Sequence, residues 1–209
     1  MPRLTILITL SVSLVLAACT SISYDLPAVS SDTDGKRHSG KFIWHDLISD
    51  DPKGSEAFYG ALFGWQFRSL ELLGANYWVI SLDGTPIAGM VDQSDIAASR
   101  DISQWMSVMS VPDPSAAAEI VSAAGGQVLR QPVSLGERGT IAVFADKQGA
   151  YFATLTTMTG DPVDRDELPG EGAFLWHELW TPNVPEAVQL YSRLGDLASE
   201  ARGGTAPAD

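Results

Sequence analysis

One local pattern occurs twice in this chain of 209 residues, and it limits the folds that the chain can adopt. In each copy an apolar run precedes an Asp-Pro pair, at Asp51–Pro52 and again at Asp113–Pro114. An aspartate side chain can cap the free N–H groups at the start of a helix, and proline is tolerated at the first helical position. Both pairs therefore predict a helix that begins directly after a strand.

Three further strands follow each predicted helix. The first helix ends at Gly64 and the second at Gly125–Gly126, since glycine favours the left-handed conformation found just after a helix. Each copy is thus a β-α-β-β-β unit, and two such units must pair because one alone leaves a sheet face uncovered. The predicted fold class is α+β, built from paired βαβββ modules. The predicted strands are Phe42–Ile48, Trp65–Leu70, Asn76–Leu82 and Pro86–Val91 in the first unit, and Gln104–Val111, Gln127–Val133, Thr140–Ala145 and Ala150–Thr156 in the second.

Several short segments carry a resemblance to a known family. They are Phe42–Leu47, Asp51, Phe58–Trp65, Gly125–Gly126, Asp146 and Gly149–Ala150. In order and spacing they resemble a vicinal oxygen chelate domain, the superfamily of glyoxalase I, bleomycin-resistance proteins and extradiol dioxygenases. The resemblance covers residues 41–156 and implies two βαβββ modules whose sheets curl around a shared cleft.

A third copy of the pattern begins downstream. Phe174–Leu179 matches Phe42–Leu47 at an offset of 132 residues, and Tyr191 and Leu194 fall on Tyr59 and Leu62. We expect residues 157–172 to be a linker, residues 173–195 to be the incomplete start of a second glyoxalase-like domain, and residues 196–209 to be a disordered tail. On this interpretation the chain is a shortened relative of two-domain proteins.

The N-terminal residues predict a signal that targets the protein to the bacterial cell envelope. Residues 1–18 have one positive charge and an apolar run that is too short to span a bilayer comfortably, which is typical of a signal peptide. The run ends Leu16–Ala17–Ala18–Cys19, which resembles a bacterial lipoprotein signal and implies cleavage before a lipidated Cys19. A plain secretory signal and a retained membrane anchor are the alternatives. Residues 19–40 are rich in Ser, Asp, Gly and Pro and are expected to form a flexible tether.

Two further features bear on location and partners. Thr20 after the cysteine resembles lipoproteins sent to the outer membrane, so the domain would face the periplasm. The sequence has 13 basic and 26 acidic residues, a formal net charge of −13, which disfavours nucleic acid as a partner.

The positions at which the family resemblance places metal ligands hold residues that cannot bind a metal ion. Metal-dependent members of the family hold a divalent ion with His and Glu side chains from strands. The corresponding positions in this chain are Trp44, Trp105 and Ala153. The expectation is therefore that no metal cofactor is used, with a divalent metal held by a differently aligned set as the alternative. His45 with Asp46 and Asp92 would be such a set.

The same cleft offers aromatic side chains for a ligand. Trp44, Trp105 and Tyr151 have the strand parity that faces the cleft, and Asp46 points the same way as Trp44. Aromatic faces suit a flat or cationic organic molecule, although they could equally fill the space of a former metal site. His45 is expected on the opposite face, under the helix, as a structural residue, and His177 likewise.

Two functions follow from these features. One is a membrane-tethered module that binds a small organic molecule without metal and has no catalytic residue. The other is a metal-dependent enzyme of the glyoxalase or dioxygenase type. In addition, Trp176 and Trp180 would form an exposed apolar edge on an orphan strand, which could pair with a second copy to give a homodimer.

Overall fold

A computed structural model describes residues 26–72, 75–96, 101–165 and 167–195. The first module contains β1 (Phe42–Ser49), α1 (Pro52–Phe63), β2 (Gln66–Leu72), β3 (Ala75–Leu82) and β4 (Thr85–Asp92), followed by the short 3₁₀ helix η1 (Gln93–Asp95). The second contains β5 (Gln104–Ser110), α2 (Pro114–Ala123), β6 (Gln127–Ser134), η2 (Gly136–Arg138), β7 (Gly139–Ala145) and β8 (Tyr151–Thr157). A third helix, α3 (Val184–Gly195), follows. The predicted α+β fold with two βαβββ modules is confirmed.

The Asp-Pro pairs begin α1 and α2 as predicted. The carboxylate of Asp51 accepts a hydrogen bond from the Gly54 N–H at 3.0 Å, and that of Asp113 accepts one from the Ser115 N–H at 2.8 Å. At the far end of α1, Gly64 takes a left-handed conformation with φ 71° and donates its N–H to the Gly60 carbonyl. These local bonds satisfy helix-end groups that would otherwise lack partners.

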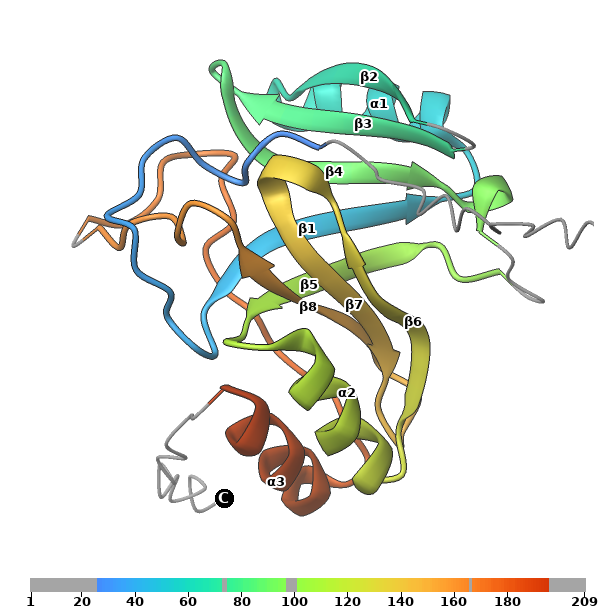
Figure 1. Ribbon diagram of the computed structural model, residues 1–209. Helices are drawn as coiled ribbons and strands as arrows, with labels where there is room; N and C mark the ends of the chain where they lie inside the picture. Colours follow the sequence, from blue (N-terminus) through green and yellow to red (C-terminus); the bar gives the residue numbers. More distant parts are fainter. Residues whose placement is uncertain (1–25, 73–74, 97–100, 166, 196–209) are drawn as a thin grey trace, which may run out of the picture.

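All eight strands form one sheet in the order β2-β3-β4-β1-β5-β8-β7-β6. The modules join where β1 pairs antiparallel with β5, and within each module the first strand pairs in parallel with the last, β1 with β4 and β5 with β8. Figure 1 shows β2–β4 running across the top and β6–β8 running steeply downward, so the sheet is strongly twisted. Strand β1 therefore lies in the middle of the sheet, between β4 and β5.

Residues 26–40 differ from the expected flexible tether. Leu26 and Val29 are buried at 4% and 3% exposure. The Leu26 N–H donates to the Leu135 carbonyl at 3.0 Å, and the Leu26 carbonyl accepts from the Arg138 N–H at 3.1 Å. In Figure 1 this blue segment passes beside the upper end of β6 and β7. The composition of the segment concealed its packing because two apolar residues are enough to anchor it.

The start of the predicted linker, residues 157–172, is also held in place. Asp161 is fully buried and accepts hydrogen bonds from the His38 N–H at 2.6 Å and the Thr157 hydroxyl at 3.0 Å. Lys41 forms an ion pair with Asp164 at 2.6 Å. The expected tether and the expected linker thus bind each other across the end of the sheet.

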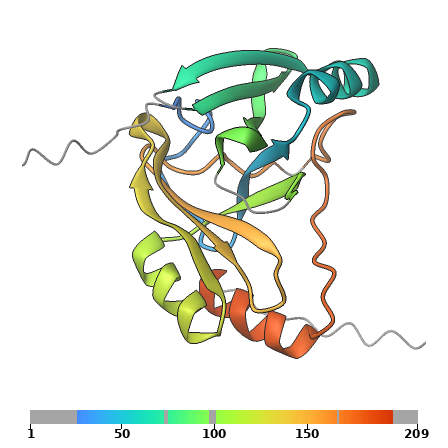
Figure 2. The ribbon, with the colours of Figure 1, turned by 90° about the vertical axis from the view of Figure 1, so that its right-hand side faces the viewer.

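Of the strand and helix expected in the third copy, only the helix forms. Residues 174–179 form no strand; they run as an extended chain between α1 and α3 (Figure 2). Within the described residues this segment pairs with no strand, and its rings lie instead against the outer face of β1. The helix does form, and α3 packs Leu190 and Leu194 against α2. Trp176 and Trp180 are exposed at 75% and 88%, but not on a strand edge.

The expected signal peptide with Cys19 and the expected tail at 196–209 lie outside the described residues. Within the described ranges, no helix has the length and apolar character needed to cross a bilayer.

Candidate ligand-binding site

The cleft face of β1 carries Trp44 and Asp46, as strand alternation predicts. Trp44 is 2% exposed and packs among Met106 and Val108 of β5 and Ala153 of β8. Two of the three positions singled out for metal in the sequence, Trp44 and Ala153, therefore share one apolar cluster. Asp46 is 6% exposed, so a carboxylate lies buried beside that cluster.

Two side chains donate hydrogen bonds directly to Asp46, and a third reaches it through one of them. Its Oδ1 accepts from the Trp44 indole N–H at 3.0 Å and from the Tyr77 hydroxyl at 2.8 Å. Arg138 in turn donates from Nη1 to the Tyr77 hydroxyl at 2.6 Å. We call Trp44, Asp46, Tyr77 and Arg138 the Asp46 cluster.

Gly89 makes room for this cluster. It pairs with Asp46 across the parallel β1–β4 ladder. A Cβ at residue 89 would lie 1.9 Å from the Tyr77 hydroxyl and 2.3 Å from Asp46 Oδ1. A strand glycine often marks such a close approach, and Gly89 is the sequence signal that could have located the site.

Arg138 is the most constrained member of the Asp46 cluster. It is 2% exposed, and its guanidinium carbon lies 4.4 Å from the centroid of the Trp44 ring, a cation–π geometry. Its Nε donates to the Pro27 carbonyl at 2.9 Å, while its Nη2 is buried with no hydrogen-bond partner among the described residues. A buried charge with an unused donor is costly, so this guanidinium has capacity for one more acceptor.

The electrostatics of the cluster follow from burial. Removal from water raises the pKa of Asp46, whereas the charge of Arg138 and the bonds from Tyr77 and Trp44 act in the opposite direction. Burial also raises the pKa of the Tyr77 hydroxyl, helped by the nearby Asp46 carboxylate. Tyr77 therefore stays protonated and serves as a donor to Asp46.

The N-terminal segment closes this face. Val29 packs in the cluster around Trp44 and Val108, and Leu26 packs against Tyr77 and Val79. Together with the bond from Arg138 to the Pro27 carbonyl, they cover the Asp46 cluster. The cleft is therefore filled by the chain itself.

Of the four residues predicted to bind a ligand, Trp44 and Asp46 meet in the Asp46 cluster. Tyr151 lies two residues before Ala153 and shares its face of β8 by alternation. The predicted cleft-facing position of Trp105 is wrong: this residue pairs with Leu47 and packs on the opposite face against Tyr59 and Trp65. The position on the cleft face is Met106, opposite Asp46, so the sequence alignment was one residue out of register.

Tyr77 and Arg138 were missed. Tyr77 lies on a strand whose sequence did not indicate which side faced the cleft. Arg138 lies in the turn η2 between β6 and β7, where a lone arginine is ordinarily solvated.

Trp105 lines a hollow on the outer face. Its indole N–H donates to the Tyr59 hydroxyl at 2.9 Å, and Trp65 donates to the Gly172 carbonyl at 2.8 Å. The hollow has a volume of about 210 Å³ and a mostly apolar lining. Its lining residues are Tyr59, Phe63, Trp65, Trp105, Gly172, Ala173 and Phe174.

Comparison with known proteins agrees with the modules described above. No family model matches the sequence. A putative glyoxylase of Mycobacterium bovis, CFP32, is 33% identical over 118 residues, which cover 56% of this chain and 44% of that protein. The anthracycline biosynthesis protein DnrV of Streptomyces peucetius is 31% identical over 182 residues, 81% of this chain and 62% of that protein. These relatives and the two βαβββ modules support the vicinal oxygen chelate/glyoxalase superfamily for this chain.

The chain spans only about half the length of these curated relatives. Among solved structures, a Mn(II)-bound glyoxalase from Novosphingobium aromaticivorans is similar to this chain at 16% identity and a TM-score of 0.46, covering 77% of this chain and 53% of that one.

At the positions where metal-dependent members bind a divalent ion, the cleft of this glyoxalase-like domain carries no metal-binding side chain. The expected ligand positions carry the Trp44 ring, the Met106 side chain and the Ala153 methyl group, which leaves Asp46 as the nearby carboxylate. In the alternative set, His45 and Asp46 point to opposite faces of β1, and Asp92 pairs with Ser49, three residues along the ladder from Asp46. Across the described ranges, no three His, Cys, Asp or Glu side chains come together as metal ligands.

On the outer face of β1, His45 lies under the 174–177 segment, not under α1 as expected. Four rings stack in the order Phe174, His45, His177 and Phe42, with centroid separations of 3.8, 4.8 and 4.5 Å. The two histidine Nε2 atoms are 2.5 Å apart. Burial, together with the charge of His177, lowers the pKa of His45 to about 4, and burial also lowers that of His177. Both imidazoles are therefore neutral at pH 7.

Tyr77→Phe tests the Asp46 cluster of the glyoxalase-like domain. The change removes one donor to Asp46 and the acceptor of Arg138 Nη1 in a buried setting, so we expect a loss of about 1–3 kcal/mol in the free energy of unfolding. Urea denaturation measures it. Tyr59→Phe, which removes a half-buried hydroxyl, should cost less. An equal loss in both variants would contradict the energetic role of the cluster.

The histidine pair predicts a pH dependence of stability. The pKa of His45 is lowered in the folded protein, so the unfolded chain binds more protons between pH 6.5 and about 4. The stacked contact should stabilise the fold fully above pH 6.5. As the pH falls to about 4, we expect the free energy of unfolding to decrease by on the order of 2–3 kcal/mol.

Urea denaturation at a series of pH values measures this slope. A His45→Phe/His177→Phe variant keeps four stacked rings, but the two substituted rings do not titrate. Subtracting its free energy of unfolding from that of the wild type at each pH removes the contribution of the carboxylates, which both proteins share. An identical pH profile in both proteins would refute the assignment.

Proposed function

We propose that this glyoxalase-like domain is a metal-independent binding module for a small, flat organic molecule that carries a carboxylate or another strong hydrogen-bond acceptor. The observation that carries the proposal is Arg138, a buried guanidinium stacked on Trp44 with an unused Nη2 donor. A planar guanidinium suits a carboxylate, which can accept two parallel N–H bonds.

The Pro27 carbonyl is the group that such a ligand would replace. It accepts from Arg138 Nε at 2.9 Å, and the segment around it is held to the η2 turn by two main-chain bonds from Leu26. Displacement of residues 26–29 would uncover the Trp44 ring, Tyr77 and Arg138 together. Because the cluster already contains a cation against Trp44, it favours an anionic ligand over the cationic one that the aromatic residues alone suggested.

We further propose that the module is attached to a bacterial membrane through a lipid on Cys19, facing the periplasm from the outer membrane. The sequence Leu16–Ala17–Ala18–Cys19 after an apolar run supports this. Several acyl chains hold a protein on a bilayer essentially permanently, at about 0.8 kcal/mol per buried CH₂. The tether between the lipid and the domain would then be short, because residues from Leu26 onward pack on the sheet.

Binding of 2-naphthoate to residues 20–209 tests the ligand proposal. Isothermal titration calorimetry should show saturable binding that Arg138→Met weakens roughly tenfold or more, since it removes charged hydrogen bonds worth about 1.5–3 kcal/mol. Val29→Ala should tighten binding several-fold, because a smaller side chain holds the covering segment less firmly. Leu129→Ala, at an exposed site on β6, is the matched control.

Two results would overturn this proposal. One is binding that is insensitive to both Arg138→Met and Val29→Ala. The other is a stoichiometric metal, detected by elemental analysis, whose removal by a chelator abolishes binding.

Labelling with a radioactive fatty acid in a bacterial host tests the anchor. The wild-type chain should incorporate label and fractionate with membranes, and Cys19→Ser should lose both, since the chain has a single cysteine. Ser21→Ala, two residues away, is the control and should keep the label. Label retained in Cys19→Ser would refute lipidation at this residue.

A further inference from the structure

Helix α1 presents apolar side chains to solvent. Phe58 and Leu62, one helical turn apart, are 59% and 56% exposed, and α1 has no buried residue. Exposed large apolar side chains in a contiguous group mark an interaction surface. We call this pair the α1 face.

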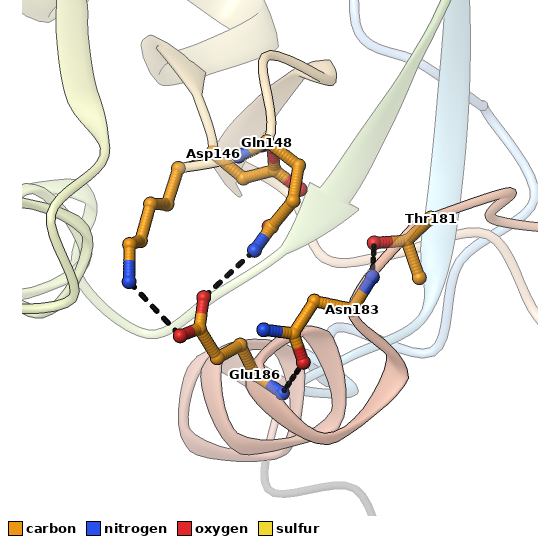
Figure 3. A network of polar contacts seen from close by, with 6 residues as sticks. Asp146, Gln148, Thr181, Asn183 and Glu186 are labelled. Carbon is orange, nitrogen blue, oxygen red and sulfur yellow. Dashed lines mark hydrogen bonds and ion pairs between the residues drawn. The ribbon is translucent and has the colours of Figure 1, made fainter.

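Helix α3 repeats the bounds and the N-terminal cap of α1. Its bounds, Val184–Gly195, are those of α1 shifted by 132 residues. The Asn183 side chain accepts from the Glu186 N–H at 3.3 Å as Asp51 accepts from Gly54. Figure 3 shows this cap together with the bond from the Asn183 N–H to the Thr181 hydroxyl, which matches the bond from Asp51 to Ser49.

The α3 counterpart of the α1 face is buried. Leu190 and Leu194 correspond to Phe58 and Leu62, and they are 5% and 4% exposed because they pack on α2 around Val121. Glu186 holds the start of α3 to the β7–β8 turn through Lys147 and Gln148, each at 2.9 Å. In this structure the helix that repeats α1 therefore packs on the outer surface of α2.

The ring stack on β1 is symmetric in the same sense. Phe174 and His177 correspond to Phe42 and His45. Phe174 stacks on His45 as Phe42 stacks on His177, and the two histidines meet in the middle. A contact in which residue i touches j while j touches i is the mark of a two-fold, self-complementary interface.

We infer that the outer face of the domain is a docking surface for a second copy of this chain, and that residues 174–195 occupy it in place of that copy's β1 and α1. When they are displaced, the second copy's Phe42 and His45 take the positions of Phe174 and His177, and its α1 packs on α2. The two-fold symmetry then brings the exposed α1 face onto the α2 of the second copy. One interface thus covers both the α1 face and the surface of α2 that α3 has left.

The surroundings leave room for this arrangement. The side of the 174–180 segment turned away from β1 is open, with Trp176 at 75% and Trp180 at 88% exposure. The remainder of the second copy therefore has space there. The internal segment competes from a high effective concentration because it is part of the same chain. The intact chain is therefore a monomer, and weakening of α3 releases the dimer surface.

The test uses residues 20–209, which contain every residue that the structure describes. Leu190→Gln/Leu194→Gln weakens the α3 contact without adding charge and keeps a good helix former. Sedimentation velocity over roughly a hundred-fold range of concentration should show a monomer for the wild type and an approximate doubling of mass for this variant. Adding Phe58→Gln/Leu62→Gln should return the mass to that of a monomer, and Phe58→Gln/Leu62→Gln alone should remain monomeric.

Three outcomes would overturn the inference: a folded Leu190→Gln/Leu194→Gln variant that stays monomeric, a dimer that persists after the Phe58 and Leu62 changes, or open-ended aggregation. If circular dichroism shows that the double variant is unfolded, Leu190→Ala takes its place. Its melting temperature should rise with protein concentration, as a dimer requires, and Phe58→Gln should abolish that rise. A melting temperature independent of concentration would count against the dimer.

Discussion

The antiparallel pairing of β1 with β5 is the contact on which the rest of the molecule depends. It joins two βαβββ modules into one sheet and leaves β1 at the centre with both faces covered. Side chains alternate along the strand, so Trp44 and Asp46 face the cleft while His45 faces outward. A shift of one residue would exchange these sets and bury the wrong groups. The candidate ligand site and the inferred docking surface are thus two sides of the same strand.

A buried charge on the cleft side explains why the N-terminal segment is ordered there. Arg138 is removed from water, and burial of a charge is tolerated only with compensating partners. Tyr77, the Trp44 ring and the Pro27 carbonyl supply them. The same guanidinium therefore holds the covering segment and would receive a ligand that displaces it. Stability of the closed form and affinity for a ligand are linked through one side chain.

Much of the fold could be predicted because its signals are local. Asp51 and Asp113 cap their helices, Gly64 ends one of them, and apolar patterns mark the strands within one or two residues. The site was predicted in part: Trp44 and Asp46 follow from alternation along a single strand, whereas Trp105 required a register across two strands and was placed on the wrong face. Arg138 and the segment at Leu26–Val29 had no local signal, since a turn arginine and a polar stretch are ordinarily solvated.

The sequence by itself determined the two modules, their helix boundaries and the partial third copy, because caps, turns and periodicity act over a few residues. Only the tertiary structure decided what became of that third copy. Phe174 and His177 join no strand in the described part of the chain; they stack on their own counterparts Phe42 and His45, and α3 covers α2. The structure likewise placed Leu26 and Val29 in the cleft. Both outcomes depend on contacts between segments far apart in the sequence, where burial of apolar surface outweighs local preference.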